Sequence, residues 1–126
     1  MPLTSPHRKW WENVVFLTLA VAMFAFVVNS YLLEQKVYKQ RVLYYQLMLL
    51  RNGVNIYKLV NRENPDKLLT LAVESYTLPG DNTGYRYIER FPINAKSQVL
   101  DPFGKPYVYD KVHGWVMSTS PGYEMW

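Results

Sequence analysis

The chain has 126 residues, a formal net charge of +4 and no cysteine. This length allows one small domain beside a membrane segment, and the absence of thiols excludes disulfides, cysteine nucleophiles and iron–sulfur clusters. Tyrosine is common, with 11 copies, and it suits interfaces and wet-edged cores because its ring is apolar and its hydroxyl is polar.

The N-terminal part of the sequence predicts a membrane helix. Residues 1–9 contain two prolines and are expected to form an extended tail. In the next stretch, residues 10–33, the core from Val14 to Val28 has no charge, glycine or proline. At about 1.5 Å per residue, a helix of this length crosses a hydrocarbon layer of about 30 Å. The residues expected in the span include Trp10, Trp11, Val14, Phe16, Phe24, Phe26, Val28 and Tyr31.

Residues 34–62 are expected to continue this helix as a stem. They contain no proline, and apolar residues recur at steps of three and four, which gives one apolar stripe. The stripe consists of Leu47, Leu50, Val54 and Tyr57, and continues to Val60 or Asn61. Gly53 marks a candidate kink, because a glycine inside a helix costs roughly 1 kcal/mol relative to alanine.

The net positive charge is concentrated in the stem. Residues 34–62 have a net charge of +5, whereas residues 63–126 have a net charge of −2. A basic collar beside a membrane most simply contacts lipid phosphates or an acidic partner. Nucleic acid is not an expected partner, because no basic face is interleaved with aromatic residues. The candidate lipid or partner contacts are Arg8, Lys9, Lys36, Tyr38, Lys39, Arg41, Tyr44 and Tyr45.

The three tyrosines of this set allow two interpretations. In the first, one side of the stem packs on the head, and the tyrosines lie at the solvent-exposed border of this contact. In the second, the tyrosines form a helix face for partner helices, because tyrosine is enriched at binding hot spots. Apolar residues on more than one face of the stem favour a partner slightly.

Residues 63–126 are expected to form a small α+β head. Asn64-Pro65-Asp66 is typical of a helix start, with a capping residue, a proline at the first helical position and an acid in the first turn. This helix is expected to run to about Ser75. Its predicted buried side consists of Leu68, Leu69, Leu71, Ala72 and Tyr76.

The last third of the sequence predicts β structure. Residues 85–91 alternate partly between apolar and polar, which indicates an edge strand or an extended segment. Residues 101–104 have the composition of a tight turn. Residues 106–110 and 115–118 are then expected to pair as an antiparallel hairpin, in which Gly114 supplies a positive φ.

The order of these parts resembles the type IV pilins and the pseudopilins of type II secretion. The most specific stretch runs from Asp101 to Tyr109 and resembles the Asp-Pro-Trp-Gly-x-x-Tyr-x-Tyr motif of major pseudopilins. The resemblance implies a single-pass helix that continues into a stem, a pilin-like head, a cytoplasmic N-terminus and a periplasmic C-terminal head. The residues that match this motif, with structural roles in the family, are Asp101, Pro102, Phe103, Gly104, Tyr107 and Tyr109.

Two features depart from the family pattern. Pilin precursors have a glycine before their cleavage point and Phe-Thr-Leu-x-Glu after it, whereas this region reads Arg8-Lys9-Trp10-Trp11-Glu12, so the chain is expected to stay uncleaved. No small-x-small site follows the span, so the segment is also not expected to be removed as a signal peptide. Major pseudopilins bind calcium through an acidic loop. Residues 118–126 contain one acid, whereas calcium takes roughly six to eight oxygen ligands, so no calcium site is expected.

The residues predict no catalytic site, no metal site and no cofactor. The two histidines have no ligand-like spacing and are interpreted as surface residues, and the acids Glu89, Asp101 and Asp110 are dispersed along the chain. Ser118-Thr119-Ser120 has the composition of a turn and lacks a nucleophile elbow. The chain is therefore not expected to be an enzyme, and a small-molecule binding module has no support beyond the aromatic content.

Two functions remain, both with an α+β, pilin-like fold. In the first, the chain is a non-catalytic accessory subunit of the bacterial cytoplasmic membrane, which binds and stabilises a larger membrane protein complex through its transmembrane helix and extracytoplasmic head. In the second, it is a genuine pseudopilin or minor pilin of secretion or pilus machinery. The expected partners are membrane lipids and other membrane protein subunits, pilin-like subunits among them. The orientation depends on the resemblance, because positive charge flanks both ends of the span.

Overall fold

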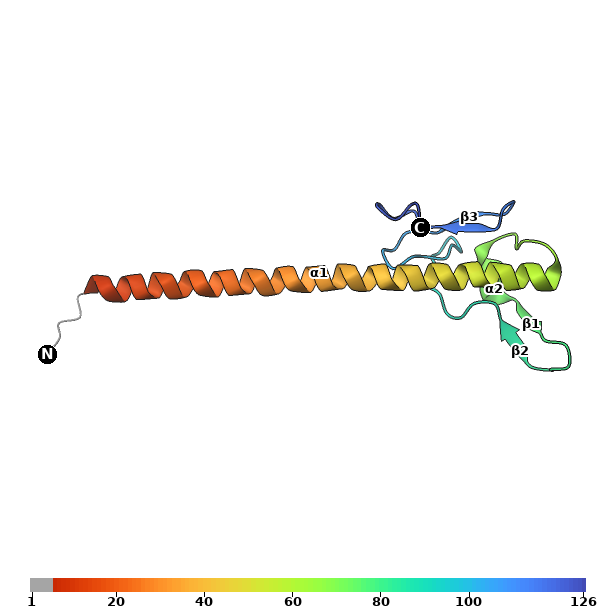
Figure 1. Ribbon diagram of the computed structural model, residues 1–126, viewed down its shortest axis with the longest axis horizontal. Helices are drawn as coiled ribbons and strands as arrows, with labels where there is room; N and C mark the ends of the chain where they lie inside the picture. The colour runs from red at the N-terminus through yellow and green to blue at the C-terminus, as the bar shows by residue number, and fades with distance from the viewer. Residues whose placement is uncertain (1–5) are drawn as a thin grey trace. The chain divides into compact units, whose positions relative to one another are not determined.

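The computed structural model describes residues 6–126, with side chains from Lys9 onward. Over these residues the protein is α+β: one long helix, α1 (Pro6–Asn61), precedes a short helix, α2 (Leu68–Val73), and four short strands (Figure 1). The strands are β1 (Ser75–Thr77), β2 (Gly84–Arg86), β3 (Val108–Asp110) and β4 (Trp115–Met117). The chain divides into two compact units, residues 1–38 and residues 39–126.

In the first unit the described chain is helical throughout, so the helix predicted over residues 10–33 is present. The helix begins at Pro6. Proline suits this position because the N–H group that it lacks has no partner in the first turn, and because its fixed φ near −65° is that of a helix. The predicted extended tail is therefore wrong for residues 6–9. The rest of that tail, residues 1–5, lies outside the described residues.

In the second unit, α1 forms the spine of the head. Leu47, Leu50 and Val54 are buried as predicted, and Leu43 extends the same stripe by one turn. The helix ends one residue before its predicted end at Arg62. Arg62 adopts a left-handed φ of 60°, and its N–H donates to the carbonyl oxygen of Lys58 at 2.9 Å, an arrangement typical of helix C-termini.

The core of the head is formed by this stripe and by side chains from the segments that follow α1. Burial of these apolar side chains is the main favourable contribution to the stability of so small a unit. The members of this apolar core cluster beyond α1 are Leu68, Leu71, Tyr87, Ile88, Val99, Tyr107, Val116 and Tyr123.

The predicted second helix is shorter than expected. It begins at Leu68 rather than at Asn64-Pro65, because Lys67 is still extended, with φ −145° and ψ 153°. The Asn64 amide donates to the carbonyl oxygens of Lys111 and Val112 instead of capping a helix. The helix also ends early. Glu74 is extended and Ser75 begins β1, so the predicted end at Ser75 is wrong.

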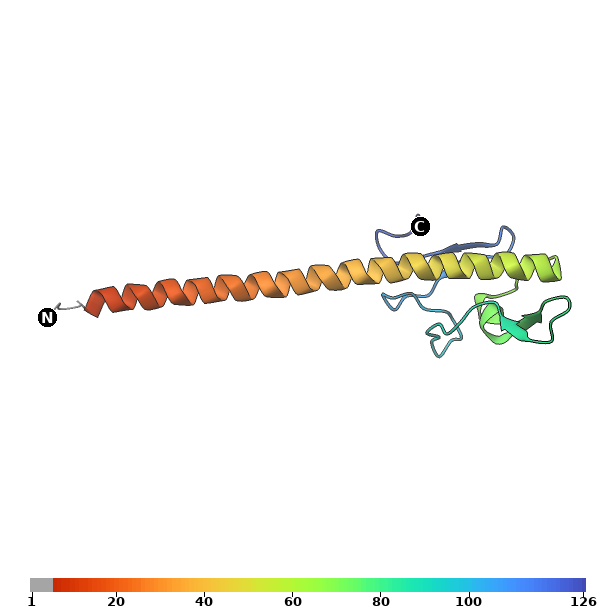
Figure 2. The same ribbon diagram turned by 60° about the horizontal axis from the view of Figure 1, so that its bottom comes forward.

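The strands form two separate two-stranded antiparallel sheets. β1 pairs with β2, in the register Tyr76 opposite Tyr85, and only the first residues of the predicted strand over 85–91 belong to β2. β3 pairs with β4, in the register Tyr109 opposite Val116, which confirms the predicted hairpin. Gly114 has a φ of 73° in its turn, as predicted. In both views the two sheets lie on opposite sides of the C-terminal part of α1 (Figures 1 and 2).

Candidate functional site

Among the side chains that the structure describes, those in the apolar part of α1 in the first unit are mostly exposed. Trp10, Trp11, Phe16, Phe24, Phe26, Val28 and Tyr31 are exposed, and Val14 is half-buried. Among the described residues, α1 is the helix that is long and apolar enough to cross a membrane, by length and composition. The Thr18 hydroxyl donates to the Val14 carbonyl oxygen at 2.8 Å, so it is satisfied within the helix. A helix that is apolar on all faces is stable in lipid or among other helices.

The residues of the predicted collar are exposed, as lipid or partner contacts require. This is true of Lys9, Lys36, Lys39 and Arg41, whereas the Arg8 side chain lies outside the described part of the chain. Lys39 Nζ lies 5.8 Å from the centroid of the Phe103 ring, within cation–π range. The structure thus brings a collar residue onto a residue of the Asp101–Tyr109 segment.

The three stem tyrosines differ in their surroundings. Tyr38 and Tyr44 are each 65% exposed and Tyr45 is 56% exposed. The Tyr44 and Trp126 rings form a T-shaped contact with their centroids 6.5 Å apart, so Tyr44 lies at a solvent-exposed edge of the head. Tyr45 instead lines a groove between α1 and residues 86–91. The Tyr44 contact agrees with the first interpretation of the stem tyrosines, whereas the partner face of the second interpretation stays a prediction.

Asp101 is a buried polar centre of the head. It is 3% exposed, and its Oδ1 accepts from the N–H groups of Phe103 and Lys105 at 2.9 and 2.8 Å. Its Oδ2 accepts from the hydroxyls of Ser120 and Ser118 at 2.5 and 3.3 Å. Gly104 closes the predicted turn with a φ of 80°. The carboxyl group thus joins this turn to the segment after β4, which is a structural role.

Tyr107 and Tyr109 attach the β3 segment to the rest of the head. The Tyr107 hydroxyl donates to Gln46 Oε1 and the Tyr109 hydroxyl donates to the Pro65 carbonyl oxygen, each at 2.8 Å. Burial raises the pKa of Tyr107 above its ordinary value. Burial, together with the nearby Asp110 charge, raises the pKa of Tyr109 to about 12. Both hydroxyls therefore remain protonated donors at neutral pH.

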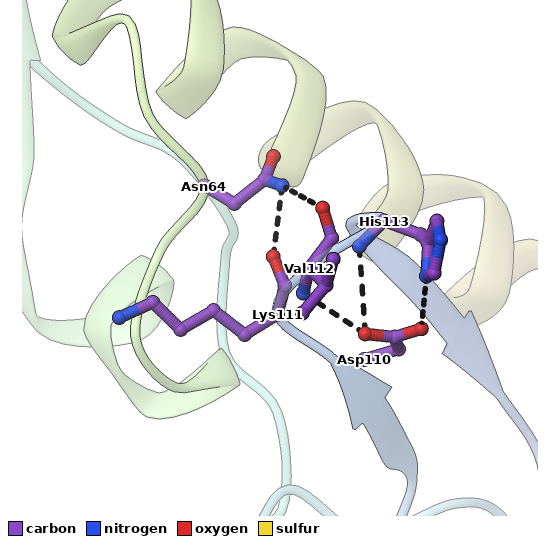
Figure 3. A network of polar contacts seen from close by, with 5 residues as sticks. All are labelled: Asn64, Asp110, Lys111, Val112 and His113. Carbon is purple, nitrogen blue, oxygen red and sulfur yellow. Dashed lines mark hydrogen bonds and ion pairs between the residues drawn. The ribbon is translucent and has the colours of Figure 1, made fainter.

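A polar network surrounds the turn between β3 and β4 (Figure 3). The Asp110 carboxylate accepts from the Val112 N–H at 2.9 Å and from His113 Nδ1 at 2.5 Å, and the hydrogen bond from His113 lowers the pKa of Asp110. Lys111 pairs with Asp66, which lowers the pKa of Asp66 and raises that of Lys111. His113 is exposed, as predicted. Among the side chains that the structure describes, no three His, Asp or Glu gather as a metal-binding group.

A groove of about 700 Å³ lies in the head between α1 and the segment after β2. The residues that line it are Val42, Tyr45, Gln46, Leu49, Arg86, Glu89, Arg90 and Phe91. Sequence reasoning singled out Tyr45 as a contact and Glu89 as a dispersed acid, but it missed Arg86 and Arg90. The available signal was the charge cluster within residues 86–90, which the strand-like alternation of the same stretch obscured.

No protein-family model matches the chain, and no curated protein or solved structure matches it significantly.

Proposed function

We propose that the protein is a non-catalytic, membrane-anchored accessory subunit, which binds and stabilises a larger bacterial membrane protein complex through its transmembrane helix and its head. The observation that carries this proposal is the uncovered apolar part of α1. Phe16, Phe24 and Phe26 are each more than 70% exposed. Exposed aromatic side chains of this size need lipid or protein neighbours, because leaving them in water forfeits the free energy of burial.

The head supports a role in binding rather than in chemistry. The buried Asp101 and Tyr107 and the half-buried Tyr109 are hydrogen-bonded within the head. Its surface carries exposed aromatic and basic residues, the groups that are enriched at protein interfaces and at lipid headgroups. Lipids are accordingly proposed as partners of Lys36, Lys39 and Arg41, together with other membrane subunits.

The fold and orientation belong to the same proposal. A long apolar helix that continues into the head, a short helix and antiparallel hairpins support a pilin-like fold, as does the Asp101–Gly104 turn. By that resemblance the N-terminus lies in the cytoplasm and the head lies outside the bacterial inner membrane, in the periplasm.

A second candidate is a genuine pseudopilin or minor pilin that assembles in type II secretion or type IV pilus machinery. The observation that favours it is the buried Asp101 and its four donors, because this motif is the most pseudopilin-like part of the sequence. Against it stands the region around Glu12, which lacks the cleavage motif of those families.

Native purification in mild detergent separates the two candidates. The full chain is isolated from membranes, and its companions and its N-terminal peptide are identified by mass spectrometry. Unrelated membrane subunits together with an uncut N-terminus are the expected result. Secretion or pilus components together with a truncated terminus would establish the second candidate and overturn the first.

A further inference from the structure

The groove between α1 and residues 86–91 has an apolar wall with helical spacing. Val42, Tyr45 and Leu49 lie three and four residues apart on α1, which is the spacing of a coiled-coil seam. This stripe differs from the buried one at Leu43 and Leu47. Val42 and Leu49 are half-buried and Tyr45 is 56% exposed, so the seam has no covering helix among residues 9–126.

The opposite wall of the groove carries unpaired positive charge. Arg86 and Arg90 are exposed, and neither guanidinium forms a hydrogen bond or an ion pair with any side chain that the structure describes. The single acid in the lining, Glu89, pairs with neither of them. Each guanidinium retains a planar fork of donors that fits a carboxylate.

Gln46 adds a further donor to the groove. Its Oε1 accepts the Tyr107 hydroxyl at 2.8 Å, which fixes the amide so that its NH₂ is the remaining polar group. The amide nitrogen has no partner among the described residues. The groove thus combines an apolar helical seam with an excess of hydrogen-bond donors over acceptors.

We propose that this groove binds an amphipathic helix of a partner membrane subunit, whose leucine-like side chains pack on Val42, Tyr45 and Leu49 and whose carboxylate pairs with Arg86 and Arg90. An acidic helix complements both walls at once, because apolar contact alone leaves the guanidiniums unpaired and a simple anion leaves the seam uncovered. This inference rests on the proposed function and names the partner chemistry at one surface of the head.

The test uses the full chain in nanodiscs of zwitterionic lipid and two labelled helical peptides of about three heptads. Both peptides carry leucine at the a and d positions. One carries glutamate at the flanking positions and the other carries glutamine. Fluorescence anisotropy is expected to show tighter binding of the glutamate peptide, with an affinity that falls as salt is added. Empty nanodiscs measure binding to lipid alone.

The double variant R86Q/R90Q is expected to weaken binding of the glutamate peptide by about tenfold or more, because each substitution removes one charge-assisted pair. The matched control Lys58→Gln removes an exposed positive charge that does not line the groove, and it is expected to leave the affinity unchanged. Equal binding of both peptides, or equal affinity of the double variant and the intact chain, would overturn the proposal.

Native purification of the double variant separates this inference from the proposed function. If membrane subunits accompany the intact chain and are lost from the double variant, both the groove and the accessory role are supported. Full retention of those subunits leaves the accessory role in place and contradicts the groove. Absence of such subunits from the intact chain contradicts the accessory role, whereas the peptide result still decides the groove. Self-association that the double variant abolishes would make a second copy the occupant and overturn the proposal.

Discussion

Gly53 of α1 lies directly against Ile88. A Cβ on Gly53 would stand 2.7 Å from Ile88 Cγ2 and 3.1 Å from the Tyr87 carbonyl oxygen. Both neighbours belong to the buried core of the head. The helix continues through Gly53 to Asn61, so this glycine does not interrupt α1. Its missing side chain instead provides the room in which residues 87–88 cross the helix at close range.

We therefore expect Gly53→Ala to destabilise the head, although alanine is the better helix former by about 1 kcal/mol. Overpacking against a β-branched side chain and a backbone carbonyl costs about 1–3 kcal/mol, and it outweighs this gain. Thermal unfolding of the full chain in detergent, followed by near-ultraviolet circular dichroism, measures the change. A melting temperature equal to or above that of the parent chain would contradict the close approach.

The matched control for that variant is Gly84→Ala in β2. The atom nearest to a Cβ there is Ser75 Oγ at 3.8 Å, which is an ordinary contact distance. Gly84 also lacks the positive φ that penalises alanine at Gly114. This variant is expected to change the stability by less than about 0.5 kcal/mol.

Local patterns predicted the elements whose determining residues are close in the sequence. The hairpin of β3 and β4 is such a case, because its turn depends on Gly114 and the strand-forming residues lie directly on either side of that turn. Asn64 shows the limit. The residues around Asn64 favour a helix cap, but its side-chain amide donates a hydrogen bond to the Lys111 carbonyl oxygen, 47 residues downstream. No local sequence pattern indicates such a contact.

The groove shows the same limit at the candidate site. Tyr45 could be singled out from its place on the stem, and Arg86 and Arg90 are visible as charges in a strand-like stretch. Their meeting in one groove depends on residues 86–91 returning to α1, which long-range packing at Ile88 determines. The long apolar helix was predicted because a stretch of this length and composition forms a helix without tertiary contacts.

We expect Asp101→Asn to destabilise the head by about 2–3 kcal/mol. The substitution keeps the shape of the side chain but replaces one carboxylate oxygen by an NH₂ group, which cannot accept a hydrogen bond. Buried donors such as the Ser120 hydroxyl are then left without an acceptor. Denaturant unfolding of the full chain in detergent measures the loss. Asp81→Asn is the control, because Asp81 also accepts from nearby groups, Thr83 and Tyr85, but lies in a loop outside the core. Equal effects of the two substitutions would contradict the central role of Asp101.

The polar turn between β3 and β4 predicts a loss of stability in acid. The pKa of Asp110 is lowered, chiefly by the hydrogen bond from His113, so the folded state binds this proton more weakly than the unfolded chain does. Its contribution is present above the unfolded pKa of about 4, and it disappears as the pH falls through the lower folded value. Asp66, whose pKa Lys111 lowers, contributes in the same direction.

Nuclear magnetic resonance titration of the Asp110 carboxyl group measures this effect directly. In the intact chain its pKa is expected below the ordinary value, and His113→Ala is expected to raise it toward that value, because the main cause of the shift is removed. Val112→Ala is the control, since Val112 bonds Asp110 through its backbone N–H, which the substitution keeps. A pKa that does not respond to His113→Ala would contradict the network in Figure 3.

The proposed membrane anchor predicts that the effect of an added charge depends strongly on its position. Val21 lies at the middle of the stretch from Val14 to Val28 and is 61% exposed. An aspartate at the centre of a membrane helix costs about 2.5–3.5 kcal/mol of insertion free energy. Val21→Asp is therefore expected to move much of the chain into the fraction extracted by alkaline carbonate, whereas Val21→Leu stays in the membrane pellet. Val112→Asp is the matched control, because Val112 is 80% exposed but lies in the head, where an added carboxylate meets water. If Val21→Asp and Val112→Asp partition alike, α1 does not anchor the protein in a bilayer, since lipid penalises a buried charge and water does not.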